Sequence, residues 1–384
     1  MTNSAASGTT RARVSIGDAW RGGRNNFNLI RLFAAWLVIY SHAWAITGID
    51  GSDLVGRMTI TKSAGAFAVD VFFVISGFLV AASLERRTWR AFLVARALRI
   101  YPALVVCVLA TVFVLGPAST TAADYWRDAT TWRYLWANAT LWRAEFWLPG
   151  VFETLPRTAV NGSLWTLPIE GRLYLALLVA GAVGMLRPMR YLPAWALAIA
   201  GACGFALWRA PLPEHLAYLI WVTSFFITGT LVWVWRERIR LSWPLLIGLL
   251  LLAALARGTR AFEPAYFALV AYGTFWLGLA VRLPRIERND LSYGVYLYGW
   301  PMQQLALLAG ATTVTSNIIA ASVATFACAA LSWFCIERPA LRWKARATAA
   351  ASAASNAPAI DASAATIETT ASTTSQHARG GAGE

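Results

Sequence analysis

Apolar stretches long enough to cross a lipid bilayer follow one another along most of the chain. A membrane-spanning helix needs about 20 mostly apolar residues. Ten stretches meet this requirement closely enough to be predicted as spans, at residues 29–47, 66–84, 100–116, 165–186, 191–208, 216–235, 243–257, 265–281, 291–309 and 312–336. With 58% hydrophobic and 14% charged residues, the composition is too apolar for an ordinary soluble domain. The sequence therefore predicts an all-α, polytopic membrane helix bundle.

The distribution of basic residues predicts how this bundle is oriented. If the N-terminus is cytoplasmic, 22 of the 33 Lys and Arg residues fall in inner segments and 9 fall in outer loops. Cytoplasmic loops of membrane proteins are enriched in these residues, so both termini are predicted to be cytoplasmic. The net charge of +14 is explained by this asymmetry and does not indicate a nucleic-acid partner. The expected partner is the lipid bilayer.

The two ends of the chain differ from the apolar region between them. Residues 1–25 form a polar, basic N-terminal tail without the pattern of a cleavable leader, so we expect the first span to stay as an anchor. Residues 347–384 are rich in Ala, Ser and Thr, lack apolar periodicity and are predicted to be disordered. Any chemistry is therefore expected within residues 26–346. The four cysteines do not have metal-ligand spacing, and we expect no metal site.

One predicted outer loop, residues 117–164, is long and unusually rich in tryptophan. Its tryptophans are Trp126, Trp132, Trp136, Trp142 and Trp147. Indole rings often lie at the level of the lipid headgroups, but they can also form a surface on which sugar rings stack. The sequence leaves both interpretations open.

Two ionisable residues in the first apolar stretch are the strongest indication of function. Arg31 and His42 are about three helical turns apart, so they share one helix face and lie about 16 Å from each other along it. Ionisable groups within a bilayer are costly and usually face a cavity or a partner. His42 is therefore a candidate base. Asp70, near the outer start of the second stretch, is expected at a similar depth, where its carboxylate could orient the imidazole.

Each of the neighbouring charges also has a purely structural interpretation. Arg31 could extend to the inner headgroups, and the carboxylate of Asp70 could interact with a helix N-terminus. Arg96 and Arg99, three residues apart at the inner boundary, could grip a phosphate group through both guanidinium groups. They could equally reflect the ordinary excess of basic residues on the inner side.

The fourth and ninth stretches carry further polar residues. Glu170 and Arg172 are two residues apart, so their side chains point to opposite sides of a helix and need partners on other helices. Tyr174 lies on the same face as Glu170, and Ser292 and Tyr296 share a face of the ninth stretch. Structural pairing and lining of an active site are both compatible with these positions.

Taken in order, these motifs resemble the acyltransferase-3 family of integral-membrane acyltransferases over roughly residues 26–345. The motifs are Arg31-x10-His42, VDVFFVISGFL (69–79), RALRIYP (96–102), LWTLPIE (164–170), SYGVYLYGWP (292–301) and ERP (337–339). The resemblance implies an enzyme that moves an acyl group, often acetyl, from cytoplasmic acyl-CoA to a hydroxyl of a cell-surface or exported glycan. It implies no bound cofactor and a place in the inner membrane of a bacterium.

The resemblance also implies roles for individual residues. His42 corresponds to the catalytic histidine, Glu170 to a functional acid, and Arg31, Arg96 and Arg99 to contacts with the acyl donor. With Asp70 added from its expected depth, the candidate catalytic residues are His42, Asp70 and Glu170. The candidate substrate-binding residues are Arg31, Arg96, Arg99, Tyr101, Trp165, Arg172, Tyr174, Ser292 and Tyr296.

Two positions depart from the family pattern. Gly299 stands where a histidine often precedes Trp-Pro, and Gly171 stands where a second acid commonly follows Glu170. Both departures narrow the expected catalytic groups to His42. We expect its neutral imidazole, oriented by a carboxylate, to take the proton of the acceptor hydroxyl as that hydroxyl attacks the thioester. A covalent acyl-histidine intermediate is the alternative route.

Two other classes of function are compatible with part of the sequence. A transporter or flippase of a glycan or lipid precursor would also have many spans and intramembrane charges, but the paired repeats and interrupted helices of transporters are not evident. A structural membrane subunit would explain the apolar composition but not the ionisable residues of the first four stretches. The sequence favours the acyltransferase.

Overall fold

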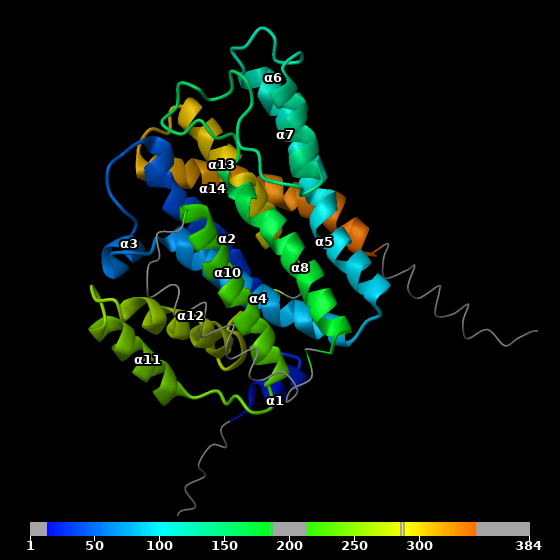
Figure 1. The fold of residues 1–384 in the computed structure, drawn as a ribbon. Helices are drawn as coiled ribbons and strands as arrows, with labels where there is room; N and C mark the ends of the chain where they lie inside the picture. Colours follow the sequence, from blue (N-terminus) through cyan, green and yellow to red (C-terminus); the bar gives the residue numbers. More distant parts are fainter. Residues whose placement is uncertain (1–13, 185, 187–212, 285, 287–288, 343–384) are drawn as a thin grey trace, which may run out of the picture. The chain divides into compact units, whose positions relative to one another are not determined.

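A computed structural model describes residues 14–184, 186, 213–284, 286 and 289–342. These residues are helical apart from loops and two isolated β-bridges, which confirms the all-α prediction for this part of the chain (Figure 1). The α-helices are α1 (Ile16–Arg21), α2 (Phe27–Thr47), α3 (Leu54–Thr59), α4 (Ala64–Glu85), α5 (Trp89–Ala110), α6 (Gly116–Ser119), α7 (Ala129–Ala139), α8 (Thr166–Ala182), α10 (Glu214–Val234), α11 (Trp243–Leu255), α12 (Phe262–Leu279), α13 (Ser292–Leu308) and α14 (Val314–Ser332). The 3₁₀-helix η2 (Gly162–Trp165) leads into α8, and the π-helical turns η1 (Thr111–Leu115) and η3 (Trp333–Glu337) extend α5 and α14.

Six helical segments are long and apolar enough to cross a membrane. They are Phe27–Thr47, Ala64–Glu85, Trp89–Ser119, Gly162–Ala182, Glu214–Val234 and Val314–Arg342. The protein is therefore a multi-pass membrane protein, but the predicted count of ten spans is not confirmed. Helices α11, α12 and α13 lie at three further predicted spans and fall outside this set; α11 has only 13 residues. The span predicted at 191–208 lies outside the described residues.

The third span begins earlier than the sequence predicted. The hydroxyl of Thr88 accepts a hydrogen bond from the backbone amide of Ala91 and caps α5, so the helix starts at Trp89. Arg96 and Arg99 consequently lie on the helix itself. This places both guanidinium groups at fixed positions on one helix face, since residues three apart are neighbours on a helix surface.

Helix α4 contacts α2, α8, α10 and α12, and most of its side chains are buried. Its closest neighbour is α10, because each helix presents a glycine to the backbone of the other. A Cβ atom on Gly77 would lie 2.0 Å from the carbonyl oxygen of Phe226, and one on Gly229 would lie 2.0 Å from that of Val74. Small residues at such crossings let two membrane helices approach each other closely.

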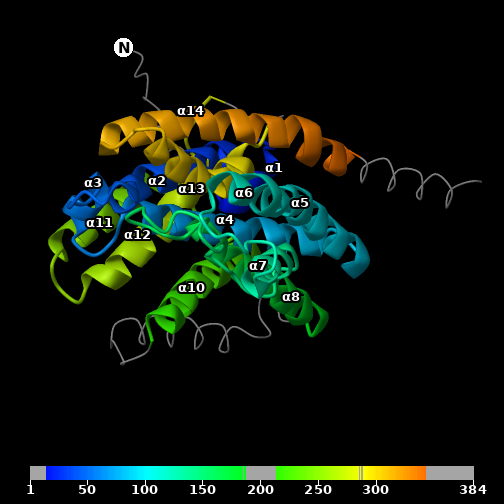
Figure 2. The ribbon, with the colours of Figure 1, turned by 90° about the horizontal axis from the view of Figure 1, so that it is seen from above.

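Helix α13 packs against α2 and α14, which also contact each other, and Figure 2 shows α14 along one edge of the bundle. Buried amides join these three helices. The side-chain amide of Gln303 donates to the carbonyl oxygen of Ile39 at 2.9 Å, and that of Asn317 donates to the carbonyl oxygen of Gln303 at 3.0 Å. This packing fixes the ninth predicted span against the first, which carries Arg31 and His42.

Part of the predicted N-terminal tail is folded. Residues 16–21 form α1, in which Ile16 is buried and the ring of Trp20 contacts the ring of Phe78. Arg21 pairs with Glu237 at 2.5 Å. The polar, basic tail predicted over residues 1–25 thus contains a short helix, whose two apolar side chains pack against the bundle. The tail predicted at 347–384 lies outside the described residues.

The tryptophan-rich loop extends from the end of α6 to η2 and contains α7. Its five tryptophan side chains are exposed. Trp126 stacks on Phe113, an exposed residue of η1, with ring centres 5.6 Å apart, and Trp132 packs against both rings. The indole cluster thus continues an exposed apolar surface of the third span. Headgroup contact and sugar stacking both stay predictions for this surface.

Candidate active site

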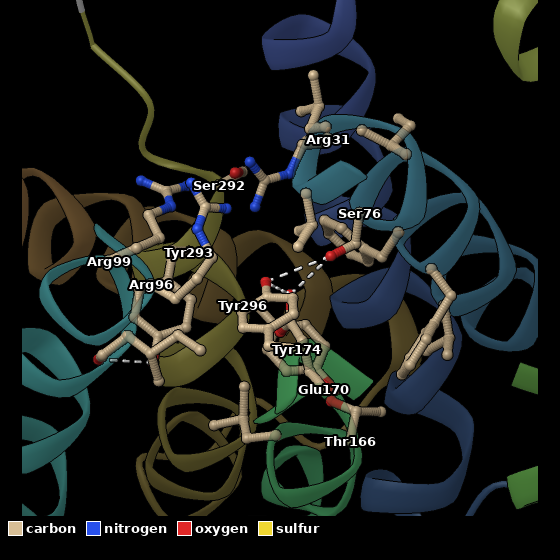
Figure 3. A pocket seen from close by; sticks show the side chains of 18 residues that line it. Arg31, Ser76, Arg96, Arg99, Thr166, Glu170, Tyr174, Ser292, Tyr293 and Tyr296 are labelled. Carbon is tan, nitrogen blue, oxygen red and sulfur yellow. Dashed lines mark hydrogen bonds between the residues drawn. The ribbon is translucent and has the colours of Figure 1, made fainter. Parts of the chain in front are cut away.

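Four helices that carry predicted site residues, together with α4, surround one pocket. Seven predicted site residues line this pocket: Arg31 on α2, Arg96 and Arg99 on α5, Glu170 and Tyr174 on α8, and Ser292 and Tyr296 on α13. We call it the inner pocket because its arginines were predicted at the inner boundary. Figure 3 shows the three guanidinium groups gathered at one end of it.

Two of the three arginines share one carboxylate that the sequence analysis missed. Oδ2 of Asp290 lies 3.3 Å from Nη1 of Arg31 and 2.5 Å from Nη2 of Arg99. The hydroxyl of Ser292 donates to Oδ1 of Asp290 at 2.5 Å. Burial acts to raise the pKa of the Asp290 carboxyl, but the charges of Arg99 and Arg31 outweigh it and hold that pKa below its ordinary value. An acidic residue next to the SYGVYLYGWP motif was the signal available in the sequence.

Arg96 differs from the other two arginines. It forms no ion pair with any residue that the structure describes, and its buried Nε atom has no hydrogen-bond partner there. Its guanidinium carbon lies 5.8 Å from the centre of the Tyr174 ring. Because an arginine cannot lose its proton in a protein, Arg96 brings a positive charge to the inner pocket without forming an ion pair with any described carboxylate.

Glu170 faces the same pocket. Its Oε1 accepts hydrogen bonds from the hydroxyl of Ser76, at 3.0 Å, and from the hydroxyl of Tyr174 one turn along α8. Arg172 points elsewhere, and its Nη2 donates to the carbonyl oxygen of Trp142 at 2.7 Å. The structure thus confirms that Glu170 and Arg172 face different sides of the helix and that Tyr174 shares the side of Glu170.

His42 lies beyond the inner pocket and lines two further pockets. We call one the aromatic outer pocket, lined among others by Lys62, Trp165, Tyr218 and Trp221. The other is the polar outer pocket, lined among others by Ser41, Trp44, Asp50, Ser52 and Arg157.

The aromatic outer pocket and the inner pocket have two lining residues in common, Val69 and Tyr296. The hydroxyl of Tyr296 is hydrogen-bonded to that of Thr166 and to the carbonyl oxygen of Ser163, both at 2.7 Å. These bonds fix the tyrosine where the two pockets meet. The residues around His42 and the three arginines therefore belong to adjoining pockets.

The imidazole of His42 is held by packing against an indole. Its ring centre lies 4.8 Å from that of Trp300, with the planes at 70° to each other, and its buried Nδ1 has no hydrogen-bond partner among the described residues. Nε1 of Trp300 donates to the carbonyl oxygen of Ala159 at 2.8 Å. A Cβ atom on Gly162 would lie 2.8 Å from the indole, so this position accommodates Trp300 because it is a glycine. Sequence analysis missed Trp300.

The expected hydrogen bond between Asp70 and His42 is absent. Oδ1 of Asp70 accepts from Nε1 of Trp221 at 3.0 Å, and Oδ2 accepts from the hydroxyl of Tyr266 at 2.9 Å. Asp70 therefore joins α4 to α10 and α12, although it still lines the aromatic outer pocket. The prediction of this pairing was wrong because similar depth does not tell toward which neighbouring helix a side chain points.

The remaining candidates have different surroundings. Trp165 and Arg172 line the aromatic outer pocket. Tyr101 lines none of the three pockets; it is exposed, and its hydroxyl donates to the carbonyl oxygen of Thr140 at 3.4 Å. Its position does not support the predicted substrate contact. Within the described residues, no group of three or more His, Cys, Asp and Glu side chains could hold a metal ion.

Gly299, one of the two departures from the family pattern, lies where α13 packs closely against α2. A Cβ atom on Gly299 would lie 3.0 Å from Cγ1 of Ile39 on α2. A histidine at this position would require Ile39 to move. With glycine at position 299, the histidine that contacts Trp300 among the described residues is His42.

Comparison with known proteins identifies the family. Residues 24–337 match the acyltransferase-3 model, described as an acyltransferase domain, and this range holds every residue that lines the three pockets. The chain belongs to the acyltransferase-3 family. The resemblance inferred from the motifs is thus confirmed, and the protein is an acyltransferase.

Two relatives of this acyltransferase-3 protein match over most of their length. An O-acetyl transferase of Shigella phage Sf6 is 28% identical over 332 residues, which cover 82% of this chain and 95% of that protein. Nodulation protein 10 of Rhizobium leguminosarum bv. viciae is 31% identical over 360 residues, which cover 84% of this chain and 94% of that protein. No solved structure gives a significant match.

Proposed function

We propose that this protein is an integral-membrane O-acetyltransferase that moves the acetyl group of acetyl-CoA to a hydroxyl of a cell-surface or exported glycan. Membership of the acyltransferase-3 family and the similarity to an O-acetyl transferase support this reaction. The observation that carries the proposal is the adjoining arrangement of two pockets. Three arginines line one and His42 lines the other, and Val69 and Tyr296 belong to both.

The inner pocket suits the phosphate-bearing end of the donor. Guanidinium groups bind phosphate through paired, charge-assisted hydrogen bonds. Asp290 holds Arg31 and Arg99 beside each other, whereas Arg96 has no carboxylate partner among the described residues. In this proposal Arg96 makes the strongest phosphate contact. The less polar pantetheine arm passes between Val69 and Tyr296, which brings the thioester towards His42.

His42 acts as the general base. Its imidazole accepts the proton of the acceptor hydroxyl while the hydroxyl oxygen bonds to the thioester carbonyl carbon. The tetrahedral intermediate then expels CoA as a thiolate, which takes up a proton from the imidazolium, so the products are the acetyl ester and CoA thiol. Contact with Trp300 sets the plane of the imidazole, since no described carboxylate bonds to Nδ1. A covalent acetyl-histidine route would instead give exchange of label between acetyl-CoA and free CoA without acceptor.

The proposed topology follows the distribution of charge. Ten spans with both termini in the cytoplasm place Arg96 and Arg99 near the cytoplasmic face and His42 near the outer face of a bacterial inner membrane. The excess of Lys and Arg in the predicted inner segments supports this orientation. Reporter fusions after α4 and after α5 would test it, since the two positions are expected on opposite sides.

Transfer by the purified protein tests the function. The full chain in lipid nanodiscs is given acetyl-CoA labelled in the acetyl group and a glycan fraction from cells that lack the gene. We expect labelled ester on the glycan and a mass increase of one acetyl group per modified sugar. His42→Gln, checked for unchanged thermal stability, is the matched inactive variant. Movement of glycan across the membrane without consumption of acetyl-CoA would contradict the proposal and favour a transporter.

A further inference from the structure

The polar outer pocket reaches His42 but shares no lining residue with the inner pocket. The end of α2, the loop that follows it and the segment at Pro156 and Arg157 form its walls. It also differs in chemistry, because carboxylates and hydroxyl groups line it beside a single arginine. Such a pocket lacks the cluster of basic groups that the phosphates of CoA require.

The loop that forms one wall is held in place by its own contacts. Helix α2 ends at Gly48, whose φ of 70° is left-handed, and a Cβ atom there would lie 2.9 Å from the ring of Pro156. Asp53 accepts hydrogen bonds from the hydroxyl of Ser41 at 2.7 Å and from the backbone amide of Ala64 at 2.9 Å. The carboxylate of Asp53 therefore supports the wall.

Two charged side chains of the polar outer pocket are free to contact a ligand. The side chains of Asp50 and Arg157 are exposed and make no hydrogen bond or ion pair with the described residues. The position of Arg157 is nevertheless fixed, because its carbonyl oxygen accepts a hydrogen bond from the side-chain amide of Gln304 at 2.5 Å. Trp44 adds an indole to the same pocket. A carboxylate, a guanidinium group and an indole together suit a sugar ring, whose hydroxyls both donate and accept hydrogen bonds and whose C–H face is apolar.

The chemistry of transfer requires two approaches to one imidazole. The hydroxyl oxygen must reach the thioester carbonyl while its proton reaches His42, so acceptor and donor cannot occupy the same pocket. The aromatic outer pocket adjoins the inner pocket and is therefore the route of the donor arm. The polar outer pocket is the remaining pocket that His42 lines among the three described here.

We propose that the polar outer pocket is the acceptor subsite, in which Asp50 and Arg157 hydrogen-bond one sugar residue of the glycan and direct its reacting hydroxyl towards His42. This proposal rests on the proposed acetyl transfer and assigns its acceptor to a separate, polar pocket. Asp50 and Arg157 then determine which sugar and which hydroxyl are acetylated. Neither residue belongs to the motifs by which the family resemblance was found.

The test compares Asp50→Asn and Arg157→Gln with two matched controls. Asp18→Asn and Arg260→Gln make the same changes at exposed residues that lie outside the tryptophan-rich loop and line none of the three pockets. Binding of the fluorescently labelled, unacetylated glycan fraction is measured on the full chain in nanodiscs without acetyl-CoA. Transfer kinetics are then measured with both substrates.

We expect each pocket variant to weaken glycan binding and to raise the KM for glycan about tenfold or more, since each removes hydrogen bonds to a charged group. The KM for acetyl-CoA and the behaviour of both controls should not change. Unchanged glycan binding in both pocket variants, or a rise in the KM for acetyl-CoA instead, would overturn the proposal. Because glycan binding is measured without the donor, this result is independent of whether acetyl transfer occurs.

Discussion

The inner pocket and the surroundings of His42 hold their functional groups in opposite ways. In the inner pocket, Arg31 and Arg99 are fixed by ion pairs to Asp290. Around His42, an indole ring provides the contact, and Nδ1 has no hydrogen-bond partner among the described residues. In the proposed reaction, Arg31 and Arg99 keep their charge and lie where an anionic donor would bind. His42 would change its charge, and contact with an uncharged ring suits such a base, because a fixed countercharge would favour only one of its two states.

The largest effect is expected at His42. His42→Gln removes the base but keeps a polar side chain of similar reach, so the rate of transfer should fall by about 10²–10⁴-fold. Binding of acetyl-CoA, measured by isothermal titration, should not change because the inner pocket is intact. Transfer at the wild-type rate would mean that His42 is not the base.

Asp290→Asn tests whether ion pairs hold the arginines of the inner pocket in place. Removing one partner of a buried ion pair typically costs about 3–5 kcal/mol of stability, here because Arg31 and Arg99 would face each other without a countercharge. The measurement is unfolding of the detergent-solubilised protein by denaturant. Asp18→Asn is the matched control, since its partner Arg21 is exposed and the loss should be much smaller. An equal loss of stability in both variants would show that the ion pairs of Asp290 contribute little to the stability of the folded protein.

The pH dependence of the stability that Asp290 contributes gives a second test of its ion pairs. The folded-state pKa of Asp290 is lowered, so its contribution to stability is present above the unfolded value of about 3.9 and is lost as the pH falls through the folded value. The stability difference between the wild type and Asp290→Asn should therefore persist at neutral pH and shrink below about pH 4. A difference that grows on acidification would contradict the assignment.

A smaller and more selective effect is expected at Arg96. Loss of a charge-assisted hydrogen bond costs about 1.5–3 kcal/mol, so Arg96→Ala should raise the KM for acetyl-CoA by about 10–100-fold. The KM for glycan should stay the same. Arg90→Ala, at an exposed residue of α5 outside the three pockets, is the control. If both variants behave alike, the phosphate contact lies elsewhere.

The smallest effect is expected at Trp300. Trp300→Phe keeps an aromatic ring beside His42 but loses the hydrogen bond to Ala159, whereas Trp300→Leu loses the ring contact as well. Because small displacements of a catalytic group slow a reaction, kcat should fall by about tenfold in the leucine variant and less in the phenylalanine variant, at unchanged KM for either substrate. Unaltered kcat in the leucine variant would show that Trp300 does not position His42.

The sequence could predict those features that depend on one helix at a time. Spacing put Arg31 and His42 on one face of the same helix, where the structure shows them lining different pockets, and it put Tyr174 beside Glu170. It could not predict how helices are rotated against their neighbours. Asp70 consequently points to Trp221 rather than to His42.

Residues that join distant segments were also missed. Asp290 bonds Arg31 across more than 250 positions of sequence, and Trp300 bonds Ala159 across more than 140. Helices α11 and α13 have 13 and 17 residues, so the spans that their apolar sequences suggested stay predictions. Family membership, in contrast, followed from short motifs whose order was visible in the chain.

Sidedness of the substrates tests the central claim most directly, namely that donor and acceptor approach His42 from opposite faces of the membrane. Membrane vesicles that contain the protein are prepared in two orientations. The glycan is enclosed in the inverted vesicles and exposed on the right-side-out vesicles. Both preparations are given external, membrane-impermeant acetyl-CoA. We expect labelled glycan only in inverted vesicles, where the inner pocket opens to the added acetyl-CoA and the glycan lies in the lumen. Equal labelling in sealed right-side-out vesicles would contradict the account.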